Sequence, residues 1–417
     1  MQWEDTPGQA AFRDEVRAFI SERFPASYTP DADAEHSLEP EDVWGYNWPV
    51  DRVCSDPGRR AGARKWAAAL AERRWIAPHW PAEYGGAGLS APEEFILHEE
   101  MMRARVPTVN GIGAFLLGPT LIEHGTPEQR AEHLLPIARG ERTWAQGFSE
   151  PGAGSDLASL RTRAIRDGDD YVVNGQKVWT SLGQYADWLF VLVRTDPEAR
   201  KHRGITFLLV DASTPGVTIR PIEDIRGAAP FAEIFFSDAR VPVRNRVGEE
   251  NMGWYVAMTA LSFERAGIGA TVKFEQALSE LVAHVRAHGL GADRAGRAAL
   301  RHEIARRYTE MRVLYNLARY TVSQQAAGGV PGYEASVNQL FGAELAQRLA
   351  ATGTKVFGPS AQFWRPPPDP GAAESEAPVA AAFTHMRFDA IAATFLGGTT
   401  EIQRNVIASR GLNLPRS

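Results

Sequence analysis

Apolar residues recur at every third or fourth position through the first third of the chain, which predicts amphipathic helices. The last of these helices begins at Thr126-Pro127-Glu128-Gln129. A capping threonine, a proline at the first helical position and a glutamine at the third favour a helix start there. Gly140 is typical of its far end. The predicted helices cover Phe12–Phe24, Arg64–Trp75, Glu93–Ala104 and Glu128–Arg139.

Between about Thr143 and Gly248 the pattern changes to short runs of β-branched and aromatic residues separated by turn residues. Asn174-Gly175 stands between the runs Tyr171–Val173 and Lys177–Thr180, and this dipeptide predicts a hairpin turn. We therefore expect a small β domain. Its further strands are predicted at Trp188–Arg194, Ile205–Val210, Val217–Pro221 and Glu233–Phe236.

Helical periodicity returns from Met252 onward, and short joins between long helices favour an antiparallel bundle. The proline-rich run from Arg365 to Gly371 predicts a surface loop, because proline lacks the backbone donor that a helix needs. The segment 28–57, rich in Pro, Asp and Trp, predicts an irregular excursion over the surface. The long helices are predicted at about 252–288, 294–327, 334–357 and, as a last pair, around 380–410.

The order of these stretches predicts an α+β multidomain protein. The chain has 417 residues, which is more than a single core usually holds, so several domains are expected. We predict an N-terminal all-α domain over 1–142, a central β-barrel-like domain over 143–250, and a C-terminal antiparallel helical bundle over 251–417.

Composition narrows the class of protein. The net charge of -6 provides no attraction to nucleic acid or to an anionic membrane. The arginines between 294 and 312 are interleaved with Glu303 and Glu310, as on a solvated helix face. No apolar run reaches the roughly 20 residues that span a bilayer. The lone Cys54 cannot form an intramolecular disulfide, and the N-terminus lacks the apolar core of a signal peptide, so we expect a cytoplasmic enzyme. The ten histidines show no metal-ligand spacing, and no metal site is predicted.

Candidate chemistry is concentrated in three blocks: QGFSEPGAGSD at 146–156, KVWTS at 177–181 and FLGGTTEIQRN at 395–405. GAGSDL at 152–157 lacks the third glycine of a dinucleotide fingerprint, and no βαβ pattern follows it, so a Rossmann site is not predicted. Its glycines suit a turn that lets the backbone approach a planar ligand, with hydroxyls from Ser149 and Ser155. Taken alone, the segment also fits a tight β turn whose serines bond locally.

In order and approximate spacing, the three blocks resemble those of the acyl-CoA dehydrogenases, flavoenzymes that oxidise the Cα–Cβ bond of acyl thioesters. The resemblance covers nearly the full length, includes HWPAEYGG at 79–86, and implies the fold of that family with FAD as cofactor. It implies an aromatic wall and hydroxyls around the flavin ring, with Ser181 near N5. The implied cofactor-binding residues are Phe148, Ser149, Gly154, Ser155, Trp179, Thr180, Ser181, Thr399, Thr400 and Glu401. Ser155 is also expected to face the pantetheine arm of the substrate.

The last block departs from the family at the position of the catalytic base. Most members have a glutamate there, and this chain has Gly397. The resemblance implies that the backbone N–H at this position stabilises the thioester oxygen, so Gly397 retains the donor but cannot remove a proton. Some relatives have their catalytic glutamate where this chain has Glu264, in LSFERAGIG, and we hypothesise that Glu264 is the base. Arg265 is then expected to orient substrate. Taken alone, both residues also fit ordinary helix ion pairs.

Two segments that hold the ADP half of FAD in many members are missing, and HVRAHGLGADRAG at 284–296 and KVFGPSAQF at 355–363 stand in their places. These features together resemble the subgroup that acts on steroid side chains and other bulky thioesters, often as α2β2 heterotetramers. The implied partners are an acyl-CoA substrate, an electron-transfer flavoprotein, and either further copies of the chain or a second chain of the family. Two other functions stay open: a flavin monooxygenase or oxidase on the same fold, and a non-catalytic partner subunit.

Overall fold

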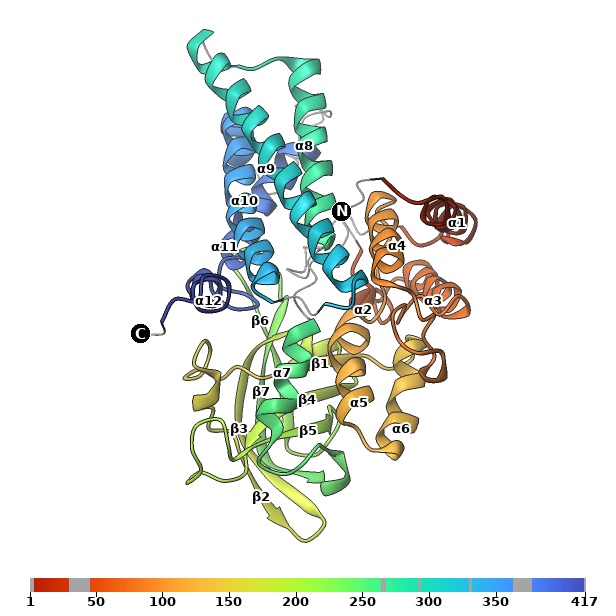
Figure 1. Cartoon of the computed structure of the whole chain (residues 1–417), viewed down its shortest axis with the longest axis vertical. Coiled ribbons are helices and arrows are strands. Elements are labelled where there is room, and N and C mark those ends of the chain that lie inside the picture. Colours follow the sequence, from red (N-terminus) through yellow and green to blue (C-terminus); the bar gives the residue numbers. More distant parts are fainter. Residues whose placement is uncertain are drawn as a thin grey trace. The chain divides into compact units, whose positions relative to one another are not determined.

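The computed structural model describes residues 4–29, 46–263, 268–291, 294–329, 332–362 and 377–415. These residues belong to two compact units (Figure 1). The sheet unit comprises Ala10–Glu94 and Ala104–Glu264, and the bundle unit comprises Met1–Gln9, Phe95–Arg103 and Arg265–Ser417.

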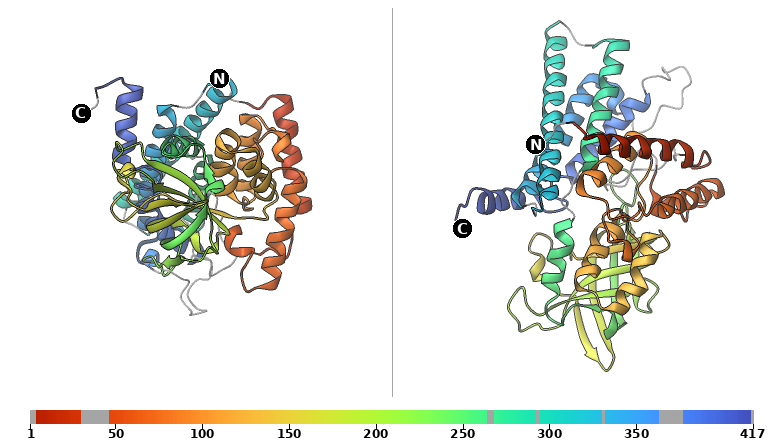
Figure 2. Two further views of the ribbon diagram at one scale, coloured as in Figure 1. Left: turned by 90° about the horizontal axis from the view of Figure 1, so that it is seen from below. Right: turned by 45° about the vertical axis from the view of Figure 1, so that its right-hand side comes forward.

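A single twisted sheet forms the centre of the sheet unit, with helices of the N-terminal part of the chain to one side (Figure 2). The strand order is β6-β7-β3-β2-β4-β5-β8, and β1 pairs in parallel with β4. Strands β4 and β5 are buried along almost their whole length, which explains why both read as continuous apolar runs. The strands are β1 (Trp144–Gly147), β2 (Arg163–Asp167), β3 (Asp170–Ser181), β4 (Trp188–Arg194), β5 (Ile205–Asp211), β6 (Val217–Ile222), β7 (Phe231–Pro242) and β8 (Arg246–Val247).

The hairpin predicted at Asn174-Gly175 is wrong, because both residues lie inside the long strand β3. The turn between β2 and β3 falls at Gly168-Asp169 instead, where Gly168 has φ +62°. Gly175 is needed for a different reason: a Cβ at this position would lie 2.5 Å from Oγ1 of Thr162. The register of β3 against β7 shifts at this point, so the glycine marks a bulge under a close neighbour.

The four helices predicted in the N-terminal third are present: two agree with the prediction within two residues at each end, whereas the first and second begin at Pro7 and Pro57, five and seven residues before the predicted starts. The capping box at Thr126 is present: its side chain accepts from the backbone of Gln129, and the Gln129 side chain accepts from the backbone of Thr126. The described part of segment 28–57 includes a short helix around the buried Trp48, so it is not wholly irregular. The helices are α1 (Pro7–Arg23), α2 (Trp48–Asp51), α3 (Pro57–Glu72), α4 (Ala91–Arg103), α5 (Gly118–His124), α6 (Pro127–Ala138) and α7 (Gly253–Phe263), and the π-helical stretch Ile112–Leu117 precedes α5.

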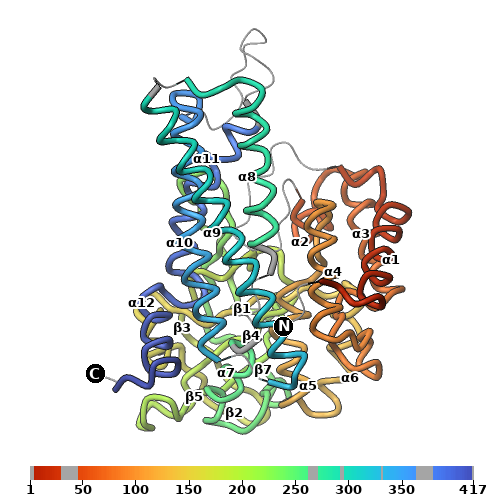
Figure 3. Tube along the Cα trace, turned by 45° about the horizontal axis from the view of Figure 1, so that its top comes forward, coloured from red at the N-terminus to blue at the C-terminus, as the bar shows by residue number. Residues whose placement is uncertain are grey.

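Long helices of the bundle unit lie side by side (Figure 3) and share an apolar core that includes Phe274, Leu281, Leu345 and Phe383. Gly353 permits α10 and α11 to approach closely, because a Cβ there would overlap the ring of Phe383. The helices are α8 (Ile268–His288), α9 (Arg294–Ala326), α10 (Tyr333–Phe357), α11 (Ala377–Ala392) and α12 (Thr400–Val406). The predicted helix 252–288 is described as α7 and α8, which belong to different units. The proline-rich run 365–371 lies outside the described residues.

Candidate functional site

The KVWTS block lies at the end of β3, where the strand is irregular. The register against β7 shifts between Lys177 and Thr180, and Trp179 within this bulge has φ +62°, in the left-handed region. This conformation is strained for a bulky residue. The indole is nevertheless 58% exposed, and its ring contact is an edge-on approach to Phe231, with centroids 6.1 Å apart. The bulge therefore presents an aromatic surface outward, which is typical of a ligand-binding residue.

Two hydroxyl residues follow this tryptophan. Thr180 is buried, and no described residue offers a hydrogen-bond partner to its Oγ1. Ser181 is half-buried and ends the strand opposite Phe231 of β7. An unsatisfied buried hydroxyl is unfavourable, so a polar group of a bound molecule near Thr180 fits the chemistry of this position.

A buried ion pair joins the KVWTS block to QGFSEPGAGSD. Nζ of Lys177 donates to Oε1 of Glu150 at 2.8 Å and to the carbonyl oxygen of Phe148 at 3.1 Å. The Glu150 carboxylate also accepts from the backbone N–H groups of Arg161, at 2.6 Å, and Thr162, at 2.8 Å. Burial alone raises the pKa of Glu150, but the Lys177 ammonium and these donors outweigh burial and hold the pKa below its usual value. The pair therefore fixes the motif loop to the strand in its charged form.

The predicted flavin-side residues of the first block lie at the start of this loop. The Phe148 ring is buried against Phe190 and Phe207, with centroids 5.7 and 6.0 Å away, so it contributes to the core of the sheet unit. The carbonyl oxygen of Ser149 accepts from the backbone of Val178 at 3.0 Å, which ties the loop to β3 a second time. The structure thus brings the first two sequence blocks together.

The glycine-rich part of the loop is open. Gly154 and Ser155 are exposed, and no atom lies within 4 Å of the position of a Cβ on Gly152 or Gly154. A side chain at either glycine would therefore occupy free space next to the motif. Beside the loop lies a cavity of about 320 Å³ lined by Glu150, Pro151, Gly152, Ser159, Arg161, Thr162, Gly175 and Gln176.

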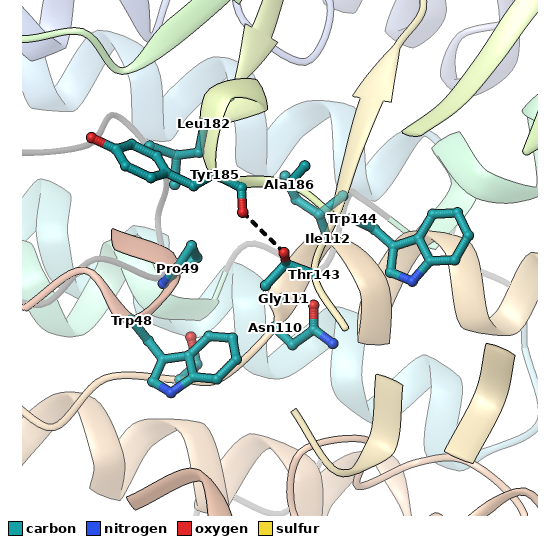
Figure 4. A pocket seen from close by; sticks show the side chains of 11 residues that line it. Trp48, Pro49, Asn110, Gly111, Ile112, Thr143, Trp144, Leu182, Tyr185 and Ala186 are labelled. Carbon is teal, nitrogen blue, oxygen red and sulfur yellow. Dashed lines mark hydrogen bonds between the residues drawn. The ribbon is translucent and has the colours of Figure 1, made fainter. Parts of the chain in front are cut away.

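A second, smaller cavity of about 40 Å³ lies in the sheet unit, at the residues that follow KVWTS (Figure 4). Leu182, with φ +50°, and Tyr185 line it, and the carbonyl oxygen of Tyr185 accepts from Oγ1 of Thr143 at 3.0 Å. Trp48 and Asn110 close the opposite side in this view. Its volume suits one or two water molecules rather than a cofactor.

The third block, FLGGTTEIQRN, belongs to the bundle unit. Oγ1 of Thr399 caps α12 by accepting from the backbone of Ile402 at 3.2 Å, and Oγ1 of Thr400 lies 3.2 Å from Oε1 of Glu401. Gly397 has a positive φ of +59°. Glu264 and Arg265, the predicted base and orienting residue, lie outside the described residues.

Comparison with known proteins identifies the family. Family models match three successive segments: the acyl-CoA dehydrogenase N-terminal domain over 56–141, middle domain over 145–239 and C-terminal domain over 251–412. The acyl-CoA dehydrogenase IpdE1 of Mycobacterium tuberculosis (strain ATCC 25618 / H37Rv) is 40% identical over 367 residues, which cover 86% of this chain and 91% of the relative. The chain belongs to the acyl-CoA dehydrogenase family.

Further relatives agree with this assignment. The acyl-CoA dehydrogenase FadE26 of the same organism is 38% identical over 371 residues, which cover 85% of this chain and 88% of the relative. Among solved acyl-CoA dehydrogenase structures, the Tcur3481-Tcur3483 steroid ACAD has a TM-score of 0.82 and 31% identity over the full length of both chains. The ChsE4-ChsE5 complex from Mycobacterium tuberculosis has a TM-score of 0.80 and 34% identity, also over both full lengths.

These findings confirm the family, the fold class and the enzyme class predicted from the sequence. The protein is an acyl-CoA dehydrogenase, with helical N- and C-terminal parts and a central sheet. Within the described part of the chain, no helix is long and apolar enough to cross a membrane. No group of three or more His, Cys, Asp or Glu side chains that could hold a metal ion occurs among the described residues.

Sequence reasoning on this acyl-CoA dehydrogenase missed the pair of Lys177 and Glu150. Both residues belong to the recognised blocks, close to the predicted Ser149 and Trp179. One signal in the sequence could have revealed the pair. Side chains alternate between the two faces of a strand, and this alternation assigns Lys177 to the buried face, where its charge needs a partner.

Proposed function

We propose that this acyl-CoA dehydrogenase uses FAD to oxidise the Cα–Cβ bond of a bulky, steroid-derived acyl-CoA thioester. The observation that carries the flavin part of the proposal is Trp179, whose exposed indole is held outward by a strained backbone. Natural proteins retain such strain chiefly where it serves a function. A flat aromatic surface next to hydroxyl groups suits the edge of an isoalloxazine ring.

Residues of the two motif blocks in the sheet unit fit this cofactor. Thr180 has a buried hydroxyl that lacks a partner among the described residues, and the space above Gly152 and Gly154 is open. We propose that a bound flavin supplies the acceptor for the hydride from Cβ. The residues proposed to hold it are Phe148, Ser149, Gly154, Ser155, Trp179, Thr180 and Ser181, with Thr399, Thr400 and Glu401 from the bundle unit.

Proton removal is assigned to Glu264, with Arg265 orienting the substrate and Ser155 facing the pantetheine arm. Gly397 has no side chain to act as base, so a carboxylate elsewhere is required. A carboxylate beside an apolar acyl chain has a raised pKa, which suits proton abstraction near neutral pH. The backbone N–H of Gly397 is proposed to stabilise the enolate oxygen that forms when the α proton leaves.

The names of similar proteins support the proposed substrate class and assembly. One similar structure is titled a steroid ACAD, and another is titled a complex of two proteins. We extend both features to this chain as proposals: a bulky thioester substrate, and an α2β2 assembly with a second chain of the family or, alternatively, a homo-oligomer. The same proposal includes an electron-transfer flavoprotein as the electron acceptor and a cytoplasmic location. It also includes domain boundaries after residues 142 and 250.

Anaerobic mixing with a panel of acyl-CoAs, including steroid-derived thioesters, tests this function through loss of the oxidised-flavin absorbance. Wild type is expected to bleach with at least one bulky thioester. Glu264→Gln should retain flavin and lose bleaching by a factor of about 10³ or more, as expected for removal of a general base. Glu249→Gln, which alters an exposed glutamate between β8 and α7, is the matched control and should bleach normally.

The same experiment separates the other two functions. Peroxide released in proportion to turnover in air would assign the protein to the oxidases or monooxygenases on this fold. A colourless protein whose partner complex keeps its activity when Glu264 is replaced would be a non-catalytic subunit. Unchanged bleaching by Glu264→Gln would refute the assignment of the base.

A further inference from the structure

Two glutamine side chains hold three consecutive carbonyl oxygens in the turn before α12. Nε2 of Gln339, on α10, donates to the carbonyl oxygen of Leu396 at 3.3 Å. Nε2 of Gln403, on α12, donates to the carbonyl oxygens of Gly397 at 2.9 Å and Gly398 at 3.3 Å. All of these residues belong to the bundle unit, so the arrangement is complete within it.

The turn needs such support because both of its central residues are glycines. Gly397 has φ +59° and Gly398 has φ +94°, a region that glycine enters easily and also leaves easily. The Gln403 side chain is only 3% exposed and fills the space beside the turn: a Cβ on Gly398 would lie 2.8 Å from its Nε2. A pair of flexible peptides is thus bound to a rigid, buried amide.

The carbonyl at one end of a peptide plane sets the direction of the N–H at the other end. In a trans peptide the two groups are coplanar and point in opposite directions. The bond from Gln339 to the Leu396 carbonyl therefore orients the N–H of Gly397. Gly397 is exposed, and no described residue accepts a hydrogen bond from its N–H. The result is an available donor with a fixed direction.

We propose that Gln339 and Gln403 are positioning residues that aim the Gly397 N–H at the carbonyl oxygen of the substrate thioester. This inference rests on the proposed function, which assigns that N–H to the enolate oxygen. A donor is effective only when it already points to where charge develops. Glycine at position 397 provides no side chain and makes the backbone more flexible. The two glutamine amides limit this flexibility and so keep the N–H donor in a fixed orientation.

The test compares Gln403→Leu and Gln339→Leu with Gln347→Leu. Gln347 is a matched control, because its Nε2 also links α10 to a carbonyl oxygen, that of Ala390 on α11, at 3.1 Å. Loss of one oxyanion donor typically lowers kcat by about 10²–10³. Misdirection of the donor should lower kcat by about 10–100-fold in the two test variants, with KM changed less than about threefold. Gln347→Leu should leave kcat within about twofold of wild type.

A spectroscopic readout separates positioning from general destabilisation. A 3-thiaacyl-CoA has an acidic α proton but no Cβ hydride, so it can only ionise when bound. The pH at which its charge-transfer absorbance with the flavin appears reports how well the enolate oxygen is stabilised. It should rise by about one to two units in both test variants, equivalent to the 10–100-fold loss in kcat, and stay unchanged in Gln347→Leu.

Gln403→Glu provides a variant of nearly unchanged shape. An ionised carboxylate cannot donate to the Gly397 and Gly398 carbonyls, whereas a protonated carboxyl has one O–H that can donate to one of them. Its kcat relative to wild type should therefore recover as the pH falls. Provided that wild type bleaches with a thioester, two outcomes would overturn the inference. In one, the test variants keep the kcat of wild type and its pH for ionisation of the analogue. In the other, they change only KM or flavin content. Absence of bleaching by wild type with every thioester would instead refute the proposed function.

Discussion

Nζ of Lys177 lies 2.8 Å from Oε1 of Glu150, with the lysine side chain fully buried and the glutamate 8% exposed. The two residues come from different sequence blocks, so their pairing fixes the position of the motif loop relative to β3. Moving a charged group from water into the protein interior costs free energy, so a buried charge is tolerated only with a partner of opposite charge. Removal of either residue leaves the other buried without its partner; burial already lowers the pKa of Lys177 to about 8 although Glu150 raises it, so without Glu150 this lysine would lose its proton more readily.

Lys177→Met and Glu150→Gln should each lower the free energy of unfolding by about 3–5 kcal/mol, because each leaves an unpaired buried group. Urea denaturation of the purified protein measures this. Lys201→Met is the matched control, since its Nζ lies 2.6 Å from Oδ1 of Asp156 in a pair that is more than half exposed. It should cost less than about 1 kcal/mol. Equal effects in both pairs would contradict a structural role for the buried one.

Trp179→Gly should leave the protein as stable as wild type or slightly more stable. The indole is mostly exposed, and glycine relieves the left-handed backbone at φ +62°, a gain of about 1 kcal/mol. Flavin content, measured from absorbance after gel filtration, should nevertheless fall. Trp66→Leu, at a fully buried tryptophan, should show the reverse pattern, with a loss of about 3 kcal/mol or more in stability. Full flavin content in Trp179→Gly would argue against a cofactor role for the indole.

Features of the fold that depend on neighbours along the chain were predictable from sequence. The capping box at Thr126 and Gln129 involves residues three positions apart, and its prediction is confirmed. The buried strands β4 and β5 were found because apolar runs bounded by turn residues need no knowledge of partners. The enzyme class was predictable in the same way, because the residues of the family motifs lie close together in short sequence blocks.

Features that depend on distant neighbours were missed. Gly175 was assigned to a hairpin turn, but the residue is required because Thr162 approaches the strand closely. The outward position of Trp179 follows from the register shift against β7, which no local pattern contains. The hydrogen bond from Gln339 to the turn before α12 could not be predicted from a local pattern either, because Gln339 lies 57 positions before Leu396.

Gly118→Ala should lower the free energy of unfolding by about 1–3 kcal/mol, the usual cost of overpacking a core. A Cβ on Gly118 would overlap the indole of Trp80, in the HWPAEYGG segment. That indole is buried and donates through Nε1 to the carbonyl oxygen of Ala114 at 2.9 Å, so it cannot easily move away. Thermal melts of the purified variants measure this effect. Gly8→Ala, in α1 with open space around it, is the control and should be neutral or stabilising.

Acid sensitivity should arise from His133, whose ring packs edge-on against the rings of Trp144 and Trp188, with centroids 5.2 and 5.0 Å away. Burial lowers the pKa of His133 from 6.5 to about 4; Glu132 opposes this shift, and the nearby Arg142 guanidinium adds to it. Between pH 6.5 and 4 the unfolded chain therefore binds a proton that the folded chain does not. Stability that is present above pH 6.5 is lost as the pH falls through this window, by up to about 3 kcal/mol.

His133→Gln removes this proton linkage, so the fall in unfolding free energy between pH 7 and pH 4.5 should become smaller by about 2–3 kcal/mol. The slope with pH is the measure, because the substitution also changes packing at every pH. His302→Gln, at an exposed histidine on α9, should leave the wild-type slope unchanged. A His133→Gln variant that loses stability with acid as steeply as wild type would place the acid sensitivity elsewhere in the chain. In that case His133 would have to take up its proton in the folded protein as readily as in the unfolded chain, against the desolvation that its tryptophan neighbours impose.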